Sequence, residues 1–310
     1  MSSRIFVALS TFAQQCDAPL SLLKDSGYPF KINPLGKRLS RDELIELGGD
    51  CEGVIAGLEP YDDYVLENMP KLRCISRCGV GIDNISLPIA RKKGIQIRNT
   101  PEVVVQPVAE LTVAMIFDLL KKLTVHTQLL KSKKWEKRTG GLLQGRKAGI
   151  LGLGKIGKKV AETLKVLEAD VYGTDLAADR SWAQSFGVKV VPLEELLRIC
   201  DILSIHLSSV DHHPFQLAQK QIAMMKKGAM VVNVARGIFV DEKALYDALK
   251  EGRLAGAALD VFSEEPYAGP LCELDNVVLT PHVATLTEES RGQMEFEATK
   301  NLIDFLSQNR

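Results

Sequence analysis

The architecture of the chain can be worked out from residues 148–175, AGILGLGKIGKKVAETLKVLEADVYGTD. This stretch begins with a short apolar run, passes through a glycine cluster, continues with the spacing of an amphipathic helix, and ends in a second short apolar run. A strand, a helix and a second strand in this order form a βαβ unit. The pattern therefore predicts a dinucleotide-binding unit.

Three glycines of this stretch have separate physical roles. Gly152 allows the tight turn out of the strand, Gly154 lets the backbone approach a pyrophosphate, and Gly157 lets the helix lie against the strand. Backbone N–H groups at the start of the helix then point toward the anion. A glycine-rich turn made for packing alone is the alternative, but strand, glycines, helix, second strand and acid all occur in the required order.

Asp175 closes the second apolar run, where a carboxylate accepts hydrogen bonds from both hydroxyls of an adenosine ribose. A 2′-phosphate at this position would meet a negative charge. The sequence therefore favours NAD over NADP as cofactor, although Arg180 follows closely enough to weaken the preference.

The composition is that of an ordinary globular protein of 310 residues, long enough for two domains. The 39 basic residues balance 39 acidic ones, so we expect neither a nucleic acid nor a membrane as partner. The early apolar run IFVAL is too short for a signal peptide or a membrane span. The six cysteines form no CxxC pair, which favours reduced, mostly buried thiols in the cytoplasm over a metal site.

Short apolar runs alternate with helical segments along the chain, which indicates parallel sheets covered on both faces. Before the glycine cluster the expected strands are 5–9, 30–33, 53–57, 72–76 and 95–99, and the expected helices are 18–26, 40–48, 62–68, 86–93 and one long helix over 103–131. After it the expected strands are 189–191, 202–207, 230–234, 255–261 and 276–280, with helices from 193 and near 218–225, 241–251 and 287–308.

The predicted fold class is α/β, with two Rossmann-like or flavodoxin-like doubly wound parallel-sheet domains and a cleft between them. The C-terminal helix can return to the first domain and make it discontinuous. We therefore expect one domain of residues 1–99 and 287–310 and a dinucleotide-binding domain of residues 100–286.

Three candidate catalytic residues each follow the carboxyl end of a strand, where ligands of open parallel sheets bind: Arg236, Glu265 and His282. Arg236 offers a planar fork of donors for a carboxylate and can polarise a carbonyl oxygen. The imidazole of His282 suits proton transfer near neutral pH, and Glu265 can accept from its second ring nitrogen and stabilise the imidazolium. The alternatives are a surface salt bridge for Arg236, an ordinary loop histidine and a commonplace acidic turn.

Two further features are compatible with binding roles. Asp260, at the end of AALD, can accept a hydrogen bond from a nicotinamide carboxamide, or it can have a helix-capping or loop role. Gly79, Val80 and Gly81 follow Cys78 after the run LRCIS, and successive backbone N–H groups of such a turn form a concavity for an anion, here the substrate carboxylate. A plain strand-to-loop turn is the alternative.

The blocks SRCGVGIDNISL, ILGLGKIG, NVARGIFVDEKAL, GAALDVFSEEP and LTPHVATLTEES together resemble the NAD-dependent D-2-hydroxyacid dehydrogenases, most closely the phosphoglycerate dehydrogenase branch. The resemblance implies a cytoplasmic, homodimeric oxidoreductase that transfers hydride between NAD and C2 of a small 2-hydroxy or 2-oxo acid. It implies a substrate-binding domain formed by both ends of the chain and a Rossmann domain between them.

The same resemblance assigns roles to residues of this sequence. Arg236 binds the substrate, Glu265 is the partner of the acid–base His282, and Asp260 lies near the nicotinamide. Backbone groups at Lys155, Ile156, Leu207 and Val234 contact the cofactor.

The sequence departs from the family pattern in two segments. Phosphoglycerate dehydrogenases commonly place arginine and serine after the strand that corresponds to GVIAG, whereas this chain has Ala56, Gly57, Leu58 and Glu59. This puts 3-phosphoglycerate in doubt, unless Lys137 or Arg138 supplies the charge. The segment LSSVDHHPF lacks the usual proline and threonine, and its adjacent His212 and His213 have no third ligand that would indicate a metal.

Alternatives to the leading interpretation are a hydroxypyruvate or glyoxylate reductase and, in another class, an NAD-sensing corepressor-like binding protein. Formate dehydrogenases are disfavoured because their pattern has glutamine where Glu265 stands. Phosphite dehydrogenases are disfavoured because theirs has lysine near Cys78. A corepressor is expected to have an appended disordered tail, and from this sequence we expect none.

Overall fold

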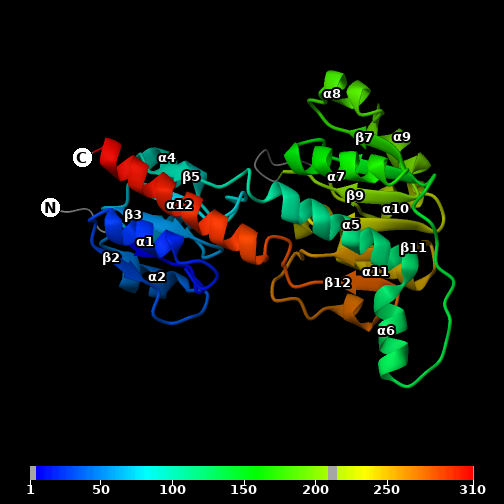
Figure 1. Ribbon diagram of the computed structural model, residues 1–310, viewed down its shortest axis with the longest axis horizontal. Coiled ribbons are helices and arrows are strands. Elements are labelled where there is room, and N and C mark those ends of the chain that lie inside the picture. Colours follow the sequence, from blue (N-terminus) through cyan, green and yellow to red (C-terminus); the bar gives the residue numbers. More distant parts are fainter. Residues whose placement is uncertain (1–4, 209–214, 310) are drawn as a thin grey trace. The chain divides into compact units, whose positions relative to one another are not determined.

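The structure, a computed structural model, describes residues 5–208 and 215–309. The chain divides into two compact units. Unit 1 consists of Met1–Val104 and Thr285–Arg310, and unit 2 consists of Val105–Ala284. The chain thus leaves unit 1 once and returns to it with its last helix (Figure 1).

Unit 1 is built on a five-stranded parallel sheet in the order β2-β1-β3-β4-β5. Its strands are β1 (Ile5–Val7), β2 (Phe30–Ile32), β3 (Gly53–Ala56), β4 (Cys74–Arg77) and β5 (Gln96–Arg98). Its helices are α1 (Ala18–Asp25), α2 (Arg41–Gly48), α3 (Asp63–Glu67), α4 (Leu87–Lys93) and α12 (Glu288–Gln308). The central strands β1, β3 and β4 are entirely buried, which explains why β1 and β3 read as continuous apolar runs rather than as alternating ones.

Helix α12 packs against α1 and against β3 and β4. Thr287 caps its first turn by accepting from the Ser290 N–H, and its residues Leu302 and Leu306 are buried. A Cβ atom on Gly53 of β3 would lie only 2.6 Å from Leu302 Cδ1, so the glycine gives the helix room to approach the sheet.

Unit 2 is built on a seven-stranded parallel sheet in the order β12-β11-β10-β9-β6-β7-β8. Its strands are β6 (Lys147–Leu151), β7 (Asp170–Thr174), β8 (Lys189–Val190), β9 (Ile202–Ile205), β10 (Ala229–Asn233), β11 (Leu254–Leu259) and β12 (Val277–Leu279). Its α-helices are α5 (Val105–Lys121), α6 (Leu123–Lys131), α7 (Lys155–Val166), α8 (Arg180–Ser185), α9 (Leu193–Ile199), α10 (Gln219–Met224) and α11 (Glu242–Lys250).

Helices cover both faces of this sheet (Figure 1). Helices α5 and α7 pack on each other, with α5 over β10, β11 and β12 and α7 over β6 and β7. Helices α9, α10 and α11 form a neighbouring series that packs on a large core including Leu203, Val231 and Ala257. The predicted α/β class with two doubly wound parallel sheets is confirmed.

The prediction of one long helix over 103–131 is wrong, because the helix breaks at Lys122, which has the left-handed φ of 55°. The carboxylate of Asp118 accepts from the backbone N–H and the hydroxyl of Thr124, so it caps the start of a second helix, α6. The short helix α8 was not predicted. Its first turn is capped by Asp179, which accepts from the Trp182 N–H.

Candidate active site

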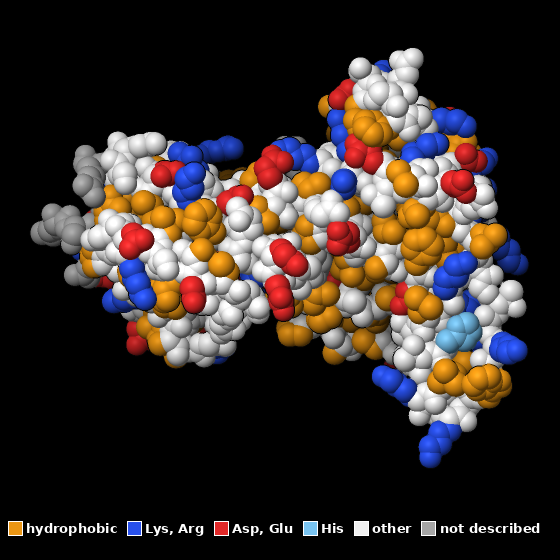
Figure 2. All heavy atoms as spheres, viewed as in Figure 1, with side chains coloured by type: hydrophobic (Ala, Val, Ile, Leu, Met, Phe, Trp, Pro, Cys, Tyr) orange, Lys and Arg blue, Asp and Glu red, His pale blue; other side chains and the backbone are white. Residues whose placement is uncertain are grey.

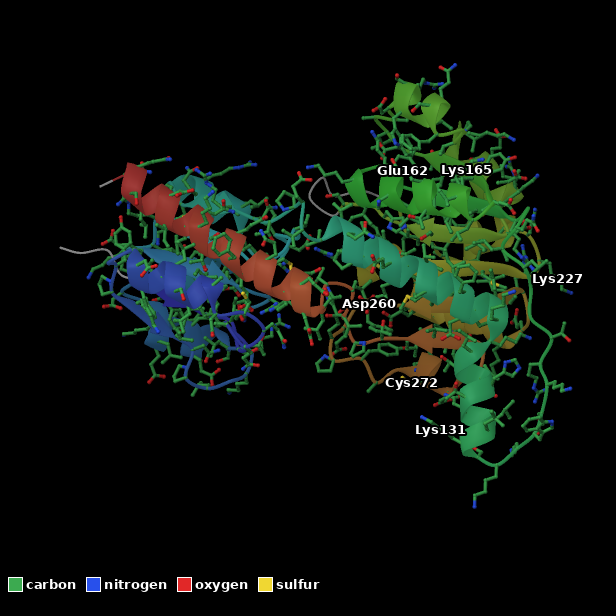
Figure 3. The ribbon with its side chains drawn as sticks, viewed as in Figure 1. Lys131, Glu162, Lys165, Lys227, Asp260 and Cys272 are labelled. Carbon is green, nitrogen blue, oxygen red and sulfur yellow. The ribbon has the colours of Figure 1, made fainter. Side chains whose placement is uncertain are left out.

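Six strands of unit 2 end in one row of directly paired residues. The row consists of Thr174, Leu151, Ile205, Asn233, Leu259 and Leu279. Every candidate residue of this unit follows one of these row residues within about six positions along the chain. The sheet therefore brings residues that are far apart in sequence to one edge. Figure 3 shows Asp260 at this edge and Lys227, which precedes β10, at the opposite edge.

The order of the strands reverses between β6 and β9, and the glycine turn lies at this switch point. Gly152 has a φ of 96°, which side chains rarely tolerate. A Cβ atom on it would also lie 2.6 Å from the carbonyl oxygen of His206, the residue that follows β9. The turn after β6 and the turn after β9 are therefore in backbone contact, and only glycine fits there.

The start of α7 fits a pyrophosphate. A Cβ atom on Gly157 would lie 1.9 Å from the Gly152 carbonyl oxygen, so the helix sits directly on the turn. By contrast, a Cβ atom on Gly154 would have no atom within 4 Å, and no side chain caps the helix at this residue. The space at Gly154 and the uncapped first turn of α7 suit an anionic ligand that binds to backbone N–H groups.

Asp175 lies one residue beyond the row, after β7. Its Oδ2 accepts from the Leu153 N–H at 2.7 Å and its Oδ1 accepts from the Ala177 N–H at 2.8 Å. The carboxylate is thus held against the glycine turn, and each oxygen keeps a second lone pair for a ligand hydroxyl. Arg180 is exposed at the start of α8.

His282 and Glu265 are in contact, as the pattern after β11 and β12 predicts. His282 Nδ1 lies 2.9 Å from Glu265 Oε2, and both side chains are about one-third exposed, at 31% and 29%. Glu265 Oε1 accepts from the Phe262 N–H at 3.1 Å, which fixes the carboxylate. His282 has a φ of 55°, and its N–H donates to the carbonyl oxygens of Asp260 and Thr280.

Asp260 is fully buried and holds the loop that carries His282. Its carboxylate accepts from the Thr280 hydroxyl and from the N–H groups of Val283 at 2.8 Å and Ala284 at 3.0 Å. Burial raises the pKa of Asp260, and the three hydrogen bonds oppose this shift. The contacts within the protein are those of a loop-capping residue, and the nicotinamide contact stays a prediction.

Arg236 lies at the same edge, three residues beyond the end of β10. Its Nη1 donates to the Ala235 carbonyl oxygen at 2.6 Å. The carbonyl oxygen of Arg236 accepts from Asn233 Nδ2 at 2.9 Å, while Asn233 Oδ1 accepts from the Ala235 N–H. Asn233 is fully buried and was not singled out in the sequence, although an amide inside the apolar run MVVNV is a visible signal.

In unit 1 the glycine turn follows β4. The N–H of Cys78 donates to the Ala56 carbonyl oxygen and the N–H of Gly79 donates to the Thr100 hydroxyl at 2.9 Å. Within the described residues, the N–H groups of Val80 and Gly81 make no hydrogen bond. Burial raises the pKa of the Cys78 thiol to about 11, so the thiol is protonated at neutral pH.

Two charged residues near this turn are buried. Glu59 is 3% exposed, and its Oε2 accepts from the Gly57 N–H at 2.7 Å. Arg77 is 9% exposed, donates to the Cys78 carbonyl oxygen, and lies under Gly79, where an added Cβ atom would meet its Nη1. Burial raises the pKa of Glu59, and the charge of Arg77 acts against that shift.

The structure also places the residues that were considered for a phosphate or a metal. Arg138 donates to Glu136 and to the His126 ring of α6 rather than to the edge residues of unit 2. Across residues 5–208 and 215–309, no group of three or more His, Cys, Asp or Glu side chains could hold a metal ion. His212 and His213 lie outside the described residues. No described helix is both long enough and apolar enough to cross a membrane.

His206 is another residue that the sequence reasoning missed. Its Nε2 lies 2.8 Å from the Ser204 hydroxyl, and burial lowers the pKa of its imidazole to about 3. The ring is therefore neutral at pH 7 and is unsuited to the acid–base role. Alternating polar residues in the run ILSIHL are the signal that could have identified it.

The fold and the glycine turn define a dinucleotide-binding α/β protein. Residues 113–284 match the family described as D-isomer specific 2-hydroxyacid dehydrogenase, NAD binding domain. The glyoxylate reductase of Korarchaeum cryptofilum is 36% identical over 275 residues, which cover 86% of this chain and 83% of that protein. The D-3-phosphoglycerate dehydrogenase of Methanocaldococcus jannaschii is 39% identical over 259 residues, covering 82% of this chain and 49% of that protein.

Solved structures give the same result. A glyoxylate reductase from Paecilomyes thermophila has a TM-score of 0.89 at 26% identity, covering 100% of this chain and 97% of that one. D-lactate dehydrogenase from Aquifex aeolicus, complexed with NAD and lactic acid, has a TM-score of 0.85 at 28% identity, covering 99% and 96%.

The chain belongs to the D-isomer-specific 2-hydroxyacid dehydrogenases, and its cofactor is NAD. It spans about half the length of the D-3-phosphoglycerate dehydrogenases that it matches.

Proposed function

We propose that the protein transfers hydride between NAD(H) and C2 of a small 2-hydroxy or 2-oxo acid with D stereochemistry. The observation that carries this proposal is the His282–Glu265 contact of 2.9 Å, which lies at the same sheet edge as the glycine turn and Arg236. When NAD is bound, its nicotinamide ring accepts or donates the hydride.

Each residue of the edge then has a chemical role. His282 presents its Nε2 to the substrate oxygen, takes the hydroxyl proton during oxidation and returns it during reduction. Glu265 accepts from Nδ1, fixes the tautomer and stabilises the imidazolium that forms. Arg236 binds the substrate carboxylate and polarises the carbonyl oxygen.

The cofactor roles follow the family pattern. The glycine turn with Lys155 and Ile156 binds the pyrophosphate, and Asp175 binds the adenosine ribose. Backbone groups at Leu207 and Val234 contact the rest of the dinucleotide, and Asp260 lies near the carboxamide. The hydrogen bond that Asp175 accepts from the Leu153 N–H supports its part in this set, because it holds the carboxylate beside the glycine turn.

Unit 1 is proposed to bind the substrate. The N–H groups of Val80 and Gly81, which make no hydrogen bond within the described residues, offer two donors for the substrate carboxylate. Gly79 contributes the φ of 128° that turns the chain, rather than a free donor, because its N–H is bonded to Thr100.

A hydroxypyruvate or glyoxylate reductase is the second candidate, and Glu59 favours it over an enzyme for 3-phosphoglycerate. Glu59 is a buried acid in the segment after β3, where phosphoglycerate dehydrogenases commonly place arginine and serine. A carboxylate there opposes the charge of Arg77 and repels a phosphate. An unphosphorylated 2-oxo acid has no phosphate for this carboxylate to repel.

We propose a homodimer in the cytoplasm. Helix α6 has no buried residue in the single chain, yet Leu123 and Leu130 on it are 55% and 57% exposed. Trp135, just after this helix, is 83% exposed, and Figure 2 shows hydrophobic side chains beside basic ones in the α6 region. Such apolar side chains are expected to be covered by a second copy of the chain.

The test is turnover with purified protein. NADH should be oxidised when hydroxypyruvate, glyoxylate, pyruvate or 3-phosphohydroxypyruvate is added, and an Arg236→Ala variant should lose that activity. Absence of Arg236-dependent turnover across the panel would remove the dehydrogenase proposal. A stable protein partner recovered with an inactive chain would support the corepressor-like alternative instead.

A further inference from the structure

Gly237, which directly follows Arg236, is in backbone contact with the loop that carries Glu265. A Cβ atom on Gly237 would lie 2.0 Å from the carbonyl carbon of Phe262, 2.2 Å from its oxygen and 2.3 Å from the Ser263 nitrogen. The peptide group between Phe262 and Ser263 therefore lies flat against Gly237. No residue with a side chain fits there without moving backbone.

The Phe262–Ser263 peptide is connected by hydrogen bonds to the proposed acid–base pair. The Phe262 N–H donates to Glu265 Oε1 at 3.1 Å, and Glu265 Oε2 lies 2.9 Å from His282 Nδ1. The Ser263 N–H donates to Glu242 Oε1 at 2.7 Å, and Glu242 is in the first turn of α11. The peptide that touches Gly237 is thus tied to both Glu265 and α11.

The turn of Arg236 and Gly237, on the other side of the contact, is also held by hydrogen bonds. The carbonyl oxygen of Arg236 accepts from Asn233 Nδ2 at 2.9 Å and from the Phe239 N–H at 3.2 Å. The Gly237 carbonyl oxygen accepts from the Val240 N–H at 3.0 Å. Since both partners are held by hydrogen bonds, the distance between the two turns depends on the absence of a Cβ atom at position 237.

We propose that Gly237 is a positioning residue that sets the spacing between Arg236 and the Glu265–His282 pair. The inference rests on the proposed function, because it assumes that these three side chains act on one substrate. An alanine at position 237 must separate the turns by more than 1 Å, since ordinary contact begins at 3.4 Å and the Cβ atom would lie at 2.0 Å. A misplacement of this size costs about 100-fold in rate.

The experiment is a double-mutant cycle on kcat/KM with NADH and the best 2-oxo acid. Gly237→Ala should lower kcat/KM about 100-fold in the native background, and less than about threefold in a Glu265→Ala background, where the spacing no longer matters. The dissociation constant of NADH should be unchanged. Equal losses in both backgrounds would overturn the proposal, because the glycine would then act through general destabilisation.

Gly149→Ala is the matched control. A Cβ atom on Gly149 would lie 3.0 Å from Cys200 Cβ and 3.2 Å from Leu196, inside the same unit and away from the proposed catalytic residues. This variant should lower the melting temperature while kcat/KM stays within about twofold. A comparable loss of kcat/KM in the control would likewise overturn the proposal.

A crystal structure of the Gly237→Ala variant tests the geometry without any turnover. The Phe262–Ser263 peptide should be displaced from residue 237 by more than 1 Å, and Gly149→Ala should leave it in place. If the Phe262–Ser263 peptide has not moved in the Gly237→Ala variant, the positioning role is refuted, whether or not the enzyme is active. If the peptide is displaced in the variant but the native protein turns over none of the acids, the spacing role of Gly237 is supported. Only the proposed function then fails.

Discussion

The carboxyl edges of the two sheets carry charged residues in opposite ways. At the edge of unit 2, Arg236, Glu265 and His282 are only partly buried, and the hydrogen bonds of Glu265 and His282 hold them as a pair. At the edge of unit 1, Glu59 and Arg77 are 3% and 9% exposed and bond to backbone groups of their own turns. The first edge presents side chains, whereas the second presents backbone N–H groups.

This difference teaches that the same parallel βα architecture can serve two kinds of chemistry. Acid–base work needs a side chain that exchanges protons, so it needs partial exposure and a fixed partner. Recognition of a carboxylate needs donors of fixed position, which a glycine turn supplies without any titrating group. The charged residues of unit 1 then shape the turn and the local field rather than react.

The largest effect is expected from the residue of unit 2 that is proposed to transfer the proton. His282→Ala should lower kcat by about 10² to 10⁴-fold, because the proton then has no positioned acceptor. The affinity for NAD, measured by titration of protein fluorescence, should remain nearly unchanged. Loss of NAD binding would show that His282 belongs to the cofactor site. The comparison of the two sheets would then no longer separate an acid–base site from a binding site.

The second effect concerns the cofactor. Asp175→Ala should weaken NAD binding by about tenfold or more, since charge-assisted hydrogen bonds contribute about 1.5–3 kcal/mol. NADP should be affected less, so the ratio of the two dissociation constants should approach one. Asp179→Ala is a useful control, because Asp179 pairs with Lys158 at 2.9 Å in the same region. Equal NAD affinity in the Asp175 variant would exclude the ribose assignment.

The third effect lies at the edge of unit 1. Glu59→Gln keeps the shape and removes the charge, so it should raise kcat/KM for 3-phosphohydroxypyruvate relative to hydroxypyruvate. About tenfold is expected for the loss of one like charge at a buried position. An unchanged ratio would mean that the buried acid does not act on the substrate, and that this edge binds by its backbone alone.

The smallest effect is on stability and lies away from both edges. Ser40 and Glu43 form a capping box at the start of α2, in which each side chain accepts a hydrogen bond from the backbone N–H of the other residue. Ser40→Ala should therefore lower the unfolding free energy by about 1 kcal/mol without changing turnover. The exposed Ser181, whose hydroxyl makes no hydrogen bond within the described residues, provides the control substitution to alanine. Urea unfolding measures both variants.

The contribution of this capping box to stability should depend on pH. Hydrogen bonds from Lys37 and from the Ser40 backbone lower the pKa of Glu43 from 4.5 to about 2. A lowered pKa in the folded state stabilises the fold at pH values above about 4.5, and this contribution is lost as the pH falls toward about 2. The difference in unfolding free energy between the native protein and the Glu43→Gln variant should therefore disappear as the pH falls from about 4.5 to about 2.

The repeated strand-and-helix pattern made both sheets predictable, because buried parallel strands are short apolar runs that flanking helices separate. The neighbourhood of Glu265 and His282 was predictable as well, since each follows a strand of one parallel sheet. The break at Lys122 was not, because it depends on how the Asp118 side chain turns toward Thr124. The contact between Gly237 and Phe262 joins distant turns, and no local pattern encodes such packing.

The path of the chain has a consequence for the order in which the protein is made. Unit 2 is continuous, so all of its strands and helices are available as soon as residue 284 leaves the ribosome. Unit 1 must wait, because α12 packs on β3 and β4 and is synthesised last of all its elements. During synthesis β3 and β4 therefore lack the helix that packs on them while the whole of unit 2 is translated.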